Sequence, residues 1–221
     1  MNKNKLLVVS IVACILILSI PLGVFAISEQ SKTSIAGDLY QTLLEENNKE
    51  ILATYNGQHI TTDVVEYTIQ MNNLYNASEV EGLSVNAQKR KAIDDIIKSI
   101  IMLEEAERRG LGATDREIEA TIKNTISAYE VPEGKEMIDD YCASLNITFE
   151  EYLEMIAEQS PRTIARQKLR DALGKEYCEN NGLEYTKINP PDGMAEAVDA
   201  AIEELVEANR SGVTYYIEEA E

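Results

Sequence analysis

Apolar residues recur at helical spacing along most of this chain. The clearest example runs from about Asn86 to Arg109, where one face carries Ile93, Ile96, Ile97, Ile100, Ile101, Met102 and Leu103. A spacing of three and four residues is typical of an amphipathic helix. Gly110 follows, where a residue in the left-handed conformation commonly ends a helix. Thr114 and Thr148 each precede a glutamate by three residues, which predicts two capping boxes at the start of further helices. The pattern predicts a mainly helical protein.

Two short β-prone segments interrupt the helical pattern. In the first, at residues 51–60, Asn56 and Gly57 separate two short runs, and both residues tolerate the positive φ of a tight hairpin turn. The second is Val213 to Ile217, near the end of the chain. We expect this last strand to pair with the hairpin. The predicted fold is therefore a bundle of amphipathic helices with a small β-hairpin or short sheet.

Two further signals concern helix boundaries. Asp63, with Glu66 three residues later, predicts a capped helix directly after the hairpin. Pro161 lies inside an apolar helical pattern, where proline either kinks a helix or occupies the first turn of a new one. Both readings of Pro161 stay open at this point.

The chain divides into four segments by composition. Residues 1–27 are a signal peptide or transmembrane anchor, and residues 28–50 are a polar tether followed by a helix. Residues 51–188 form the helical domain. The sequence Asn-Pro-Pro-Asp-Gly at 189–193 is a boundary signal, because two prolines and a turn motif interrupt regular structure. Residues 189–221 then hold a C-terminal helix and the short strand.

The N-terminal segment predicts export. Lys3 and Lys5 precede an apolar run, and Ala26 provides a small residue at a cleavage position, as in a secretory signal. Residues 6–27 are also long enough to remain as an anchor. Cys14 additionally fits a lipoprotein processing site. Since the basic residues stay inside in either case, we expect the acidic remainder to be extracytoplasmic, with the membrane contacted only through this segment.

The formal net charge of -19 excludes some partners. Nucleic acid and anionic lipid surfaces are polyanions, so we expect neither to bind this chain. The acidic surface instead favours basic or neutral clients. Cys142 and Cys178 either pair outside the cell or lie as buried free thiols, and there is no disulfide framework.

Catalytic and metal-binding patterns are missing from the sequence. His59 is the only histidine, so a nucleophile has no other candidate base, and zinc-ligand spacing is lacking. The adjacent pairs Asp94-Asp95 and Asp139-Asp140 are expected to point to different sides of their helices and to be solvated. We predict no catalytic residues, no metal and no cofactor.

Four segments, in this order, resemble the N-terminal domain of the SurA and PrsA chaperones. They are Ala-Thr-Tyr-Asn-Gly-Gln-His-Ile-Thr at 53–61, Leu-Glu-Glu-Ala-Glu-Arg-Arg-Gly-Leu at 103–111, Thr-Asp-Arg-Glu-Ile at 114–118 and Leu-Asn-Ile-Thr-Phe-Glu-Glu-Tyr-Leu at 145–153. The resemblance covers roughly Leu52 to Tyr185. Each segment alone is largely capping and turn chemistry, but the order and spacing of the four are specific.

The resemblance implies the trigger-factor/SurA peptide-binding fold, holding unfolded or newly exported polypeptides. Many relatives also carry a parvulin-type prolyl isomerase module, whose pocket is built around a pair of histidines with a cysteine or aspartate. This chain has only His59, and the tail after Pro191 is too short for the module. An active isomerase is therefore the least favoured function. The alternative to a chaperone is an envelope adaptor that binds one folded partner.

Two stripes of methionine, tyrosine and aliphatic residues are candidates for peptide binding, because such side chains adapt to varied apolar ligands. The first is Tyr67, Met71, Leu74 and Tyr75, and the second is Tyr141, Tyr152, Met155 and Ile156. Residues with this spacing also commonly face a protein core. Both interpretations remain open from the sequence.

Overall fold

The computed structural model describes residues 50–217. This part of the chain is 73% helix, which confirms the predicted mainly helical class. Its elements are β1 (Ile51–Tyr55), β2 (Gln58–Thr61), α3 (Thr62–Tyr75), α4 (Ala77–Val80), α5 (Val85–Arg108), α6 (Asp115–Tyr129), α7 (Pro132–Leu145), α8 (Phe149–Asn181), α9 (Met194–Asn209), the 3-10 turn η2 (Arg210–Gly212) and β3 (Val213–Tyr215). The predicted signal or anchor and the tether with its helix lie outside the described residues. Within residues 50–217, no helix has both the length and the apolar character that a membrane span requires.

A three-stranded sheet is assembled from the two ends of the described chain. Asn56 and Gly57 adopt φ values of 46° and 81°, which confirms the predicted hairpin turn between β1 and β2. The strand order is β2-β1-β3, and β3 pairs antiparallel with β1, with Tyr215 opposite Ala53. The predicted pairing of the last strand with the hairpin is therefore confirmed.

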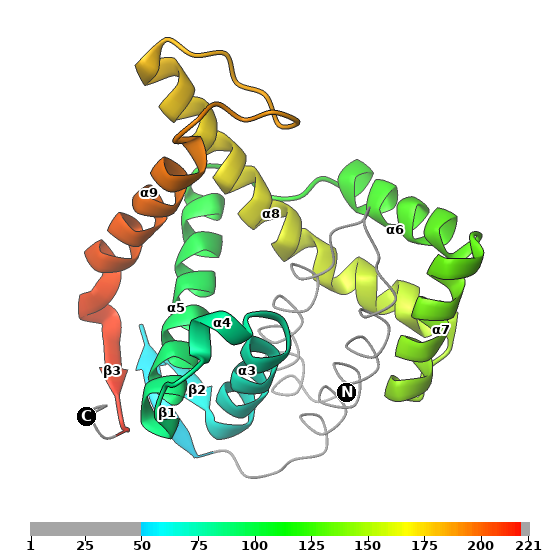
Figure 1. Cartoon of the computed structure of the whole chain (residues 1–221), viewed down its shortest axis with the longest axis horizontal. Coiled ribbons are helices and arrows are strands. Elements are labelled where there is room, and N and C mark those ends of the chain that lie inside the picture. Colours follow the sequence, from blue (N-terminus) through cyan, green and yellow to red (C-terminus); the bar gives the residue numbers. More distant parts are fainter. Residues whose placement is uncertain (1–49, 218–221) are drawn as a thin grey trace.

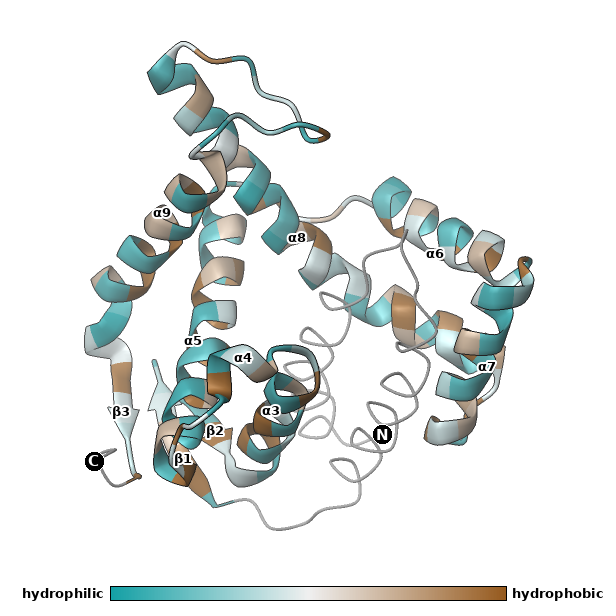
Figure 2. Cartoon of the chain, viewed as in Figure 1, coloured by the Kyte–Doolittle hydropathy of each residue, from teal (hydrophilic) through white to brown (hydrophobic). Residues whose placement is uncertain are grey.

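Helix α5 lies between α3, α8 and α9 (Figure 1). Two buried apolar clusters include its residues. The larger joins α5 to the hairpin and α3, and it includes Ile93, Ile96 and Ile100. The smaller joins the C-terminal part of α5, through Met102, to α8 and α9. Brown and teal residues alternate along α6 and α9 in Figure 2, as expected for amphipathic helices.

The helix starts follow the predicted capping chemistry in two of three cases. Thr114 and Thr148 both form complete capping boxes, with Glu117 and Glu151. The predicted cap at Asp63 is wrong, because α3 begins at Thr62 and makes no side-chain cap. Strand β2 runs directly into the helix, so Asp63 already lies in the first turn. There its carboxylate accepts a hydrogen bond of 2.5 Å from the Thr61 hydroxyl.

Helix α8 continues through Pro161 and does not restart there. Proline has no backbone N–H, so the carbonyl four residues earlier loses its usual helical partner. Before the proline, α8 packs on α6 and α7, where Phe149 stacks on Tyr129 with ring centres 3.8 Å apart. After it, Leu169 packs in the cluster with α5 and α9. One helix therefore connects the α6–α7 pair to the rest of the fold (Figure 1).

Candidate functional site

One face of α5 forms the floor of a groove. Positions 87, 90, 91, 94, 95, 98 and 102 recur every three or four residues and so share one side of the helix. Along this face lie two cavities of about 500 and 360 Å³, which have Asp95 and Lys98 in common. Their walls come from α8, α9, η2 and β3. We call the two adjoining cavities the α5 groove.

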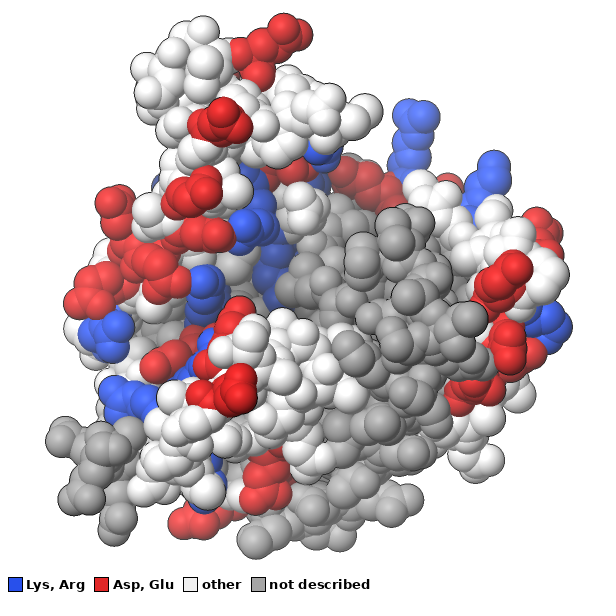
Figure 3. All heavy atoms as spheres, viewed as in Figure 1, with Lys and Arg blue, Asp and Glu red and all other residues white. Residues whose placement is uncertain are grey.

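The α5 groove is rich in cations although the chain is strongly acidic. Six of the chain's 20 lysines and arginines line it, together with three carboxylates. Three of the six cations also pair with carboxylates just outside the lining, namely Glu79, Asp199 and Glu207. The six are Arg90, Lys91, Lys98, Arg166, Arg170 and Arg210. Figure 3 shows Lys and Arg gathered in the hollow beside α9, while Asp and Glu cover the outer side of that helix.

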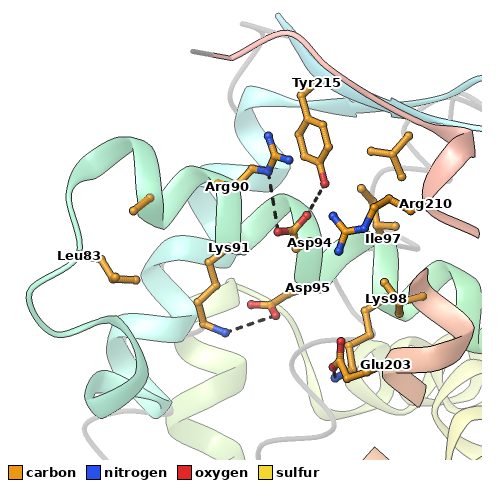
Figure 4. A pocket seen from close by; sticks show the side chains of 13 residues that line it. Leu83, Arg90, Lys91, Asp94, Asp95, Ile97, Lys98, Glu203, Arg210 and Tyr215 are labelled. Atoms are coloured by element: carbon orange, nitrogen blue, oxygen red, sulfur yellow. Dashed lines mark hydrogen bonds and ion pairs between the residues drawn. The ribbon is translucent and has the colours of Figure 1, made fainter. Parts of the chain in front are cut away.

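At one end of the groove, Arg90, Asp94 and Tyr215 form a compact cluster. The Arg90 guanidinium lies flat over the Tyr215 ring, 3.3 Å from its centre, and the Tyr215 hydroxyl donates to Asp94. Arg90 Nε is 3.9 Å from the same carboxylate. Figure 4 shows both side chains converging on Asp94. Burial, together with the bond to Asp94, raises the pKa of Tyr215 to about 12, so the hydroxyl stays a neutral donor.

Asp95 is fixed beside this cluster. Its carboxylate accepts a hydrogen bond of 2.9 Å from Asn72 Nδ2 and lies 3.5 Å from Lys91 Nζ. Burial lowers the pKa of Lys91, but Asp95 and Glu79 outweigh that effect and raise it. Asp94 contacts β3 and Asp95 contacts α3, and their side chains are 46% and 35% exposed, in keeping with the expectation that the two diverge and stay solvated. Both line the groove, because two residues about 100° apart on a helix can flank one broad furrow.

Ion pairs and a hydrogen bond hold the walls of the groove to its floor and to each other. Lys98 Nζ lies 2.5 Å from Glu203 of α9, and Arg170 of α8 lies 2.7 Å from Asp199 of α9. Arg166 is buried and donates to the Ser99 hydroxyl of α5. The arrangement presents N–H donors beside apolar side chains.

The structure distributes the two predicted peptide-binding stripes between core and surface. Four of these residues are buried, and four are half-buried. The buried ones are Tyr67, Met71, Tyr141 and Ile156, and the half-buried ones are Leu74, Tyr75, Tyr152 and Met155. All except Ile156 belong to, or pack against, the larger apolar cluster. Peptide binding by these residues stays a prediction.

The histidine and the two cysteines considered for catalysis or pairing lie outside the groove. His59 is exposed on β2. Cys142 and Cys178 are both buried and free, so the alternative of two buried thiols is the one observed. Burial, with a contribution from Asp139, raises the pKa of Cys142 to about 11. Among residues 50–217, no three or more His, Cys, Asp or Glu side chains gather as a metal site would require.

Sequence reasoning missed the α5 groove. The charged positions from Arg90 to Lys98 recur every three or four residues, and this repeat could have identified one polar face of the helix. The walls could not have been found in that way, because Arg166, Arg170 and Arg210 come from segments far away in the sequence.

Comparisons with known proteins give one match. A family described as the SurA-like N-terminal domain matches residues 1–170, more than three quarters of the chain, and no parvulin domain is matched. The match includes the hairpin and the whole floor of the groove, and it ends inside α8. No curated protein and no solved structure matches the chain.

Proposed function

Because the chain belongs to the family of SurA-like N-terminal domains, we propose that it is a chaperone that holds unfolded or newly exported polypeptides. Membership of this family indicates a chaperone-like or peptide-binding role in general. The proposed action is reversible binding without a chemical step. We propose no prolyl isomerase activity, because His59 alone does not provide the histidine pair of a parvulin pocket.

The α5 groove is the observation that carries this proposal. From Arg90 to Met102 its floor follows α5 for twelve residues, which corresponds to about 18 Å at 1.5 Å per residue. An extended peptide of about five residues has the same length. Val206 and Val213, both half-buried, supply apolar contacts within it. The groove therefore has the dimensions and lining for a short stretch of unfolded chain.

The half-buried residues of the two predicted stripes provide additional apolar surface. Leu74 and Tyr75 lie at the end of α3, and Tyr152 and Met155 lie near the start of α8. Tyrosine and methionine suit clients of varied sequence, because one presents an apolar ring with a polar tip and the other adapts its shape. We propose that these four residues contact the client, while the four buried ones support the fold.

The proposed place of action is the far side of the cytoplasmic membrane. The basic start and apolar run of residues 1–27 support export, and relatives with this domain are typically extracytoplasmic. The chain would be held there by residues 6–27, or released after cleavage near Ala26.

Aggregation measurements test the proposal. The full chain, purified in a mild detergent, is mixed with two unrelated denatured proteins, one acidic and one basic, as each is diluted from denaturant. A holdase lowers the light scattering of both at near-stoichiometric ratios, and detergent alone is the control. If neither client is protected, the proposal fails. Capture of a single folded envelope protein would then identify the chain as an adaptor.

A further inference from the structure

We propose that the α5 groove selects client segments that carry carboxylate side chains on both sides of an apolar residue. This proposal rests on the proposed function, since it specifies which polypeptide segments bind. It reverses the preference for basic or neutral clients that the net charge alone favours, because the local lining of a cleft, rather than the distant surface, governs the energy of a bound ligand.

The carboxylates of the groove are already engaged by the protein. Asp94 accepts from Tyr215, Asp95 accepts from Asn72, and Glu203 is paired with Lys98. A ligand that enters the groove therefore meets acidic groups whose charge is largely compensated. The cations are paired as well, since Glu79, Asp199 and Glu207 outside the lining contact Lys91, Arg170 and Arg210. What the groove offers a ligand is therefore its unused N–H donors, because each cation has more donors than it uses in an ion pair.

Several cations keep donors available for a ligand. The Arg90 guanidinium makes no hydrogen bond to any side chain or carbonyl of residues 50–217, and only its stacking on Tyr215 and the 3.9 Å ion pair hold it. Lys98 and Arg170 each use one nitrogen atom in an ion pair with α9. Lysine has three N–H donors and arginine five, so each retains unused donors.

These donors are positioned before a ligand arrives. The ring of Tyr215 fixes the plane of Arg90, and the acidic residues of α9 fix Lys98 and Arg170. Side chains held in this way lose less conformational entropy on binding. A guanidinium in a fixed plane also matches the two oxygens of a carboxylate.

The spacing of the cations predicts a sequence pattern in the client. Arg90 and Lys98 are eight residues apart on α5, or about 12 Å along the helix axis. In an extended peptide, side chains at positions i and i+4 share one face and are about 13 Å apart. Position i+2 shares that face, and it would lie near the apolar, half-buried Val206. The preferred segment is therefore acidic, any, apolar, any, acidic.

This geometry favours a peptide over a phosphate-containing lipid headgroup. One phosphate would occupy only one end of a groove of about 18 Å. The apolar side chains between the two cationic ends would then have no partner.

Binding of three labelled peptides by the full chain, in mild detergent and followed by fluorescence anisotropy, tests the proposal. Each peptide has valine at the centre and glutamate, glutamine or lysine two residues to either side. We expect the glutamate peptide to bind about tenfold more tightly than the glutamine peptide, since charge-assisted hydrogen bonds exceed neutral ones in strength. The lysine peptide should bind most weakly.

A matched pair of double variants locates the effect. Lys98→Gln with Arg170→Gln removes two groove cations, and Arg116→Gln with Lys123→Gln removes two exposed cations of α6. The first variant should lose the preference for glutamate over glutamine, so that the two peptides bind with similar affinity. The second should behave like the parent chain. Equal melting temperatures show that both variants are folded.

The outcomes separate this proposal from the one on which it rests. Equal binding of all three peptides, by a chain that still suppresses aggregation, overturns the acidic preference and leaves the chaperone function standing. A chain that neither binds peptides nor suppresses aggregation overturns both. A competition experiment adds glycerol phosphate or unlabelled glutamate peptide to the labelled complex. If glycerol phosphate displaces the labelled peptide at the lower concentration, the proposal is overturned in favour of a lipid headgroup.

Discussion

The Tyr215 hydroxyl donates a hydrogen bond to the carboxylate of Asp94, which lies 121 residues earlier in the chain. One partner belongs to the last strand of the sheet, and the other lies in the middle of α5. The bond therefore ties the sheet to the floor of the α5 groove. The same tyrosine ring supports Arg90, so the stability of the sheet and the shape of the groove depend on one side chain.

Replacing Tyr215 with phenylalanine should lower the free energy of unfolding by about 1 kcal/mol, because one partly buried hydrogen bond is lost while the ring remains. Urea unfolding measures the change. Tyr216→Phe is the matched control, since Tyr216 is 60% exposed, and it should change stability by less than about 0.5 kcal/mol. Equal effects of the two substitutions would mean that the bond to Asp94 contributes no stability.

Alkaline pH should weaken the sheet. Burial and the hydrogen bond to Asp94 raise the pKa of Tyr215 to about 12. Burial and a hydrogen bond to Glu104 raise the pKa of Tyr55 to about 12 as well. A pKa raised on folding contributes stability that is complete below the unfolded value of about 10. We expect this stability to be lost as the pH rises from 10 to 12. Urea unfolding at several pH values, with tyrosinate absorbance as a second probe, checks the window.

Glu105 should stabilise the junction between α5 and α8 in a pH-dependent manner. Hydrogen bonds from Arg108 have the largest effect on the pKa of Glu105. Burial opposes them, and a bond from Arg109 adds to them, so the pKa falls to about 2. Arg109 also pairs with Glu176 of α8. Because the pKa is lowered on folding, the stabilisation is present above the unfolded value of about 4.3 and is lost as the pH falls toward 2.

The substitution Glu105→Gln should therefore cost about 2 kcal/mol at pH 7, and the difference from the parent chain should shrink as the pH falls from 5 to 2. Glu107→Gln, at an exposed neighbouring position, is the control and should have little effect. A cost for Glu105→Gln that stays constant down to pH 2 would contradict the assignment of the lowered pKa to the folded state.

The hairpin turn should be sensitive to a side chain at Gly57. This residue has a φ of 81°, and an added Cβ would meet no atom within 4 Å, so only backbone strain opposes alanine there. We expect Gly57→Ala to lower the melting temperature through a cost of about 1 kcal/mol. Gly112→Ala also adds a Cβ in open space, without a positive φ, and should be nearly neutral. Equal melting temperatures for the two variants would contradict this prediction.

Cys142 and Cys178 should resist both oxidation and alkylation in the folded protein. They lie on different helices and are buried, and burial raises the pKa of Cys142 to about 11. The reactive thiolate of Cys142 is therefore scarce, so we expect iodoacetamide at pH 8 to modify it about 100-fold more slowly than in urea. Mass spectrometry of a Cys14→Ser variant measures both sites. A disulfide between them after mild oxidation would contradict the structure.

Local chemistry made much of the fold predictable. The turn at Asn56-Gly57 and the capping boxes at Thr114 and Thr148 involve residues within three positions of one another. Their conformations therefore depend little on the rest of the chain. The pairing of β3 with the hairpin could be expected because a two-stranded ribbon alone is barely stable and few other β-prone segments exist.

Other features depended on contacts that a single sequence does not reveal. The hydroxyl of Thr61 and the direct passage from strand to helix determine the role of Asp63. At Pro161, packing on both halves of α8 overrides the tendency of proline to end a helix. The candidate groove depends on the longest-range contacts, because its cations come from three separate elements, α5, α8 and η2, that only the tertiary fold brings together.

The sheet also sets the order in which this molecule can mature. Strand β1 lies between a neighbour that is made almost immediately and another that follows roughly 160 residues later. At common synthesis rates this delay is roughly 10 to 30 s, during which one edge of β1 has no partner. Unpaired edges invite pairing with other chains. A protein proposed to hold unfolded polypeptides thus passes through an incompletely folded stage of its own, which ends only when β3 has been synthesised and has reached β1.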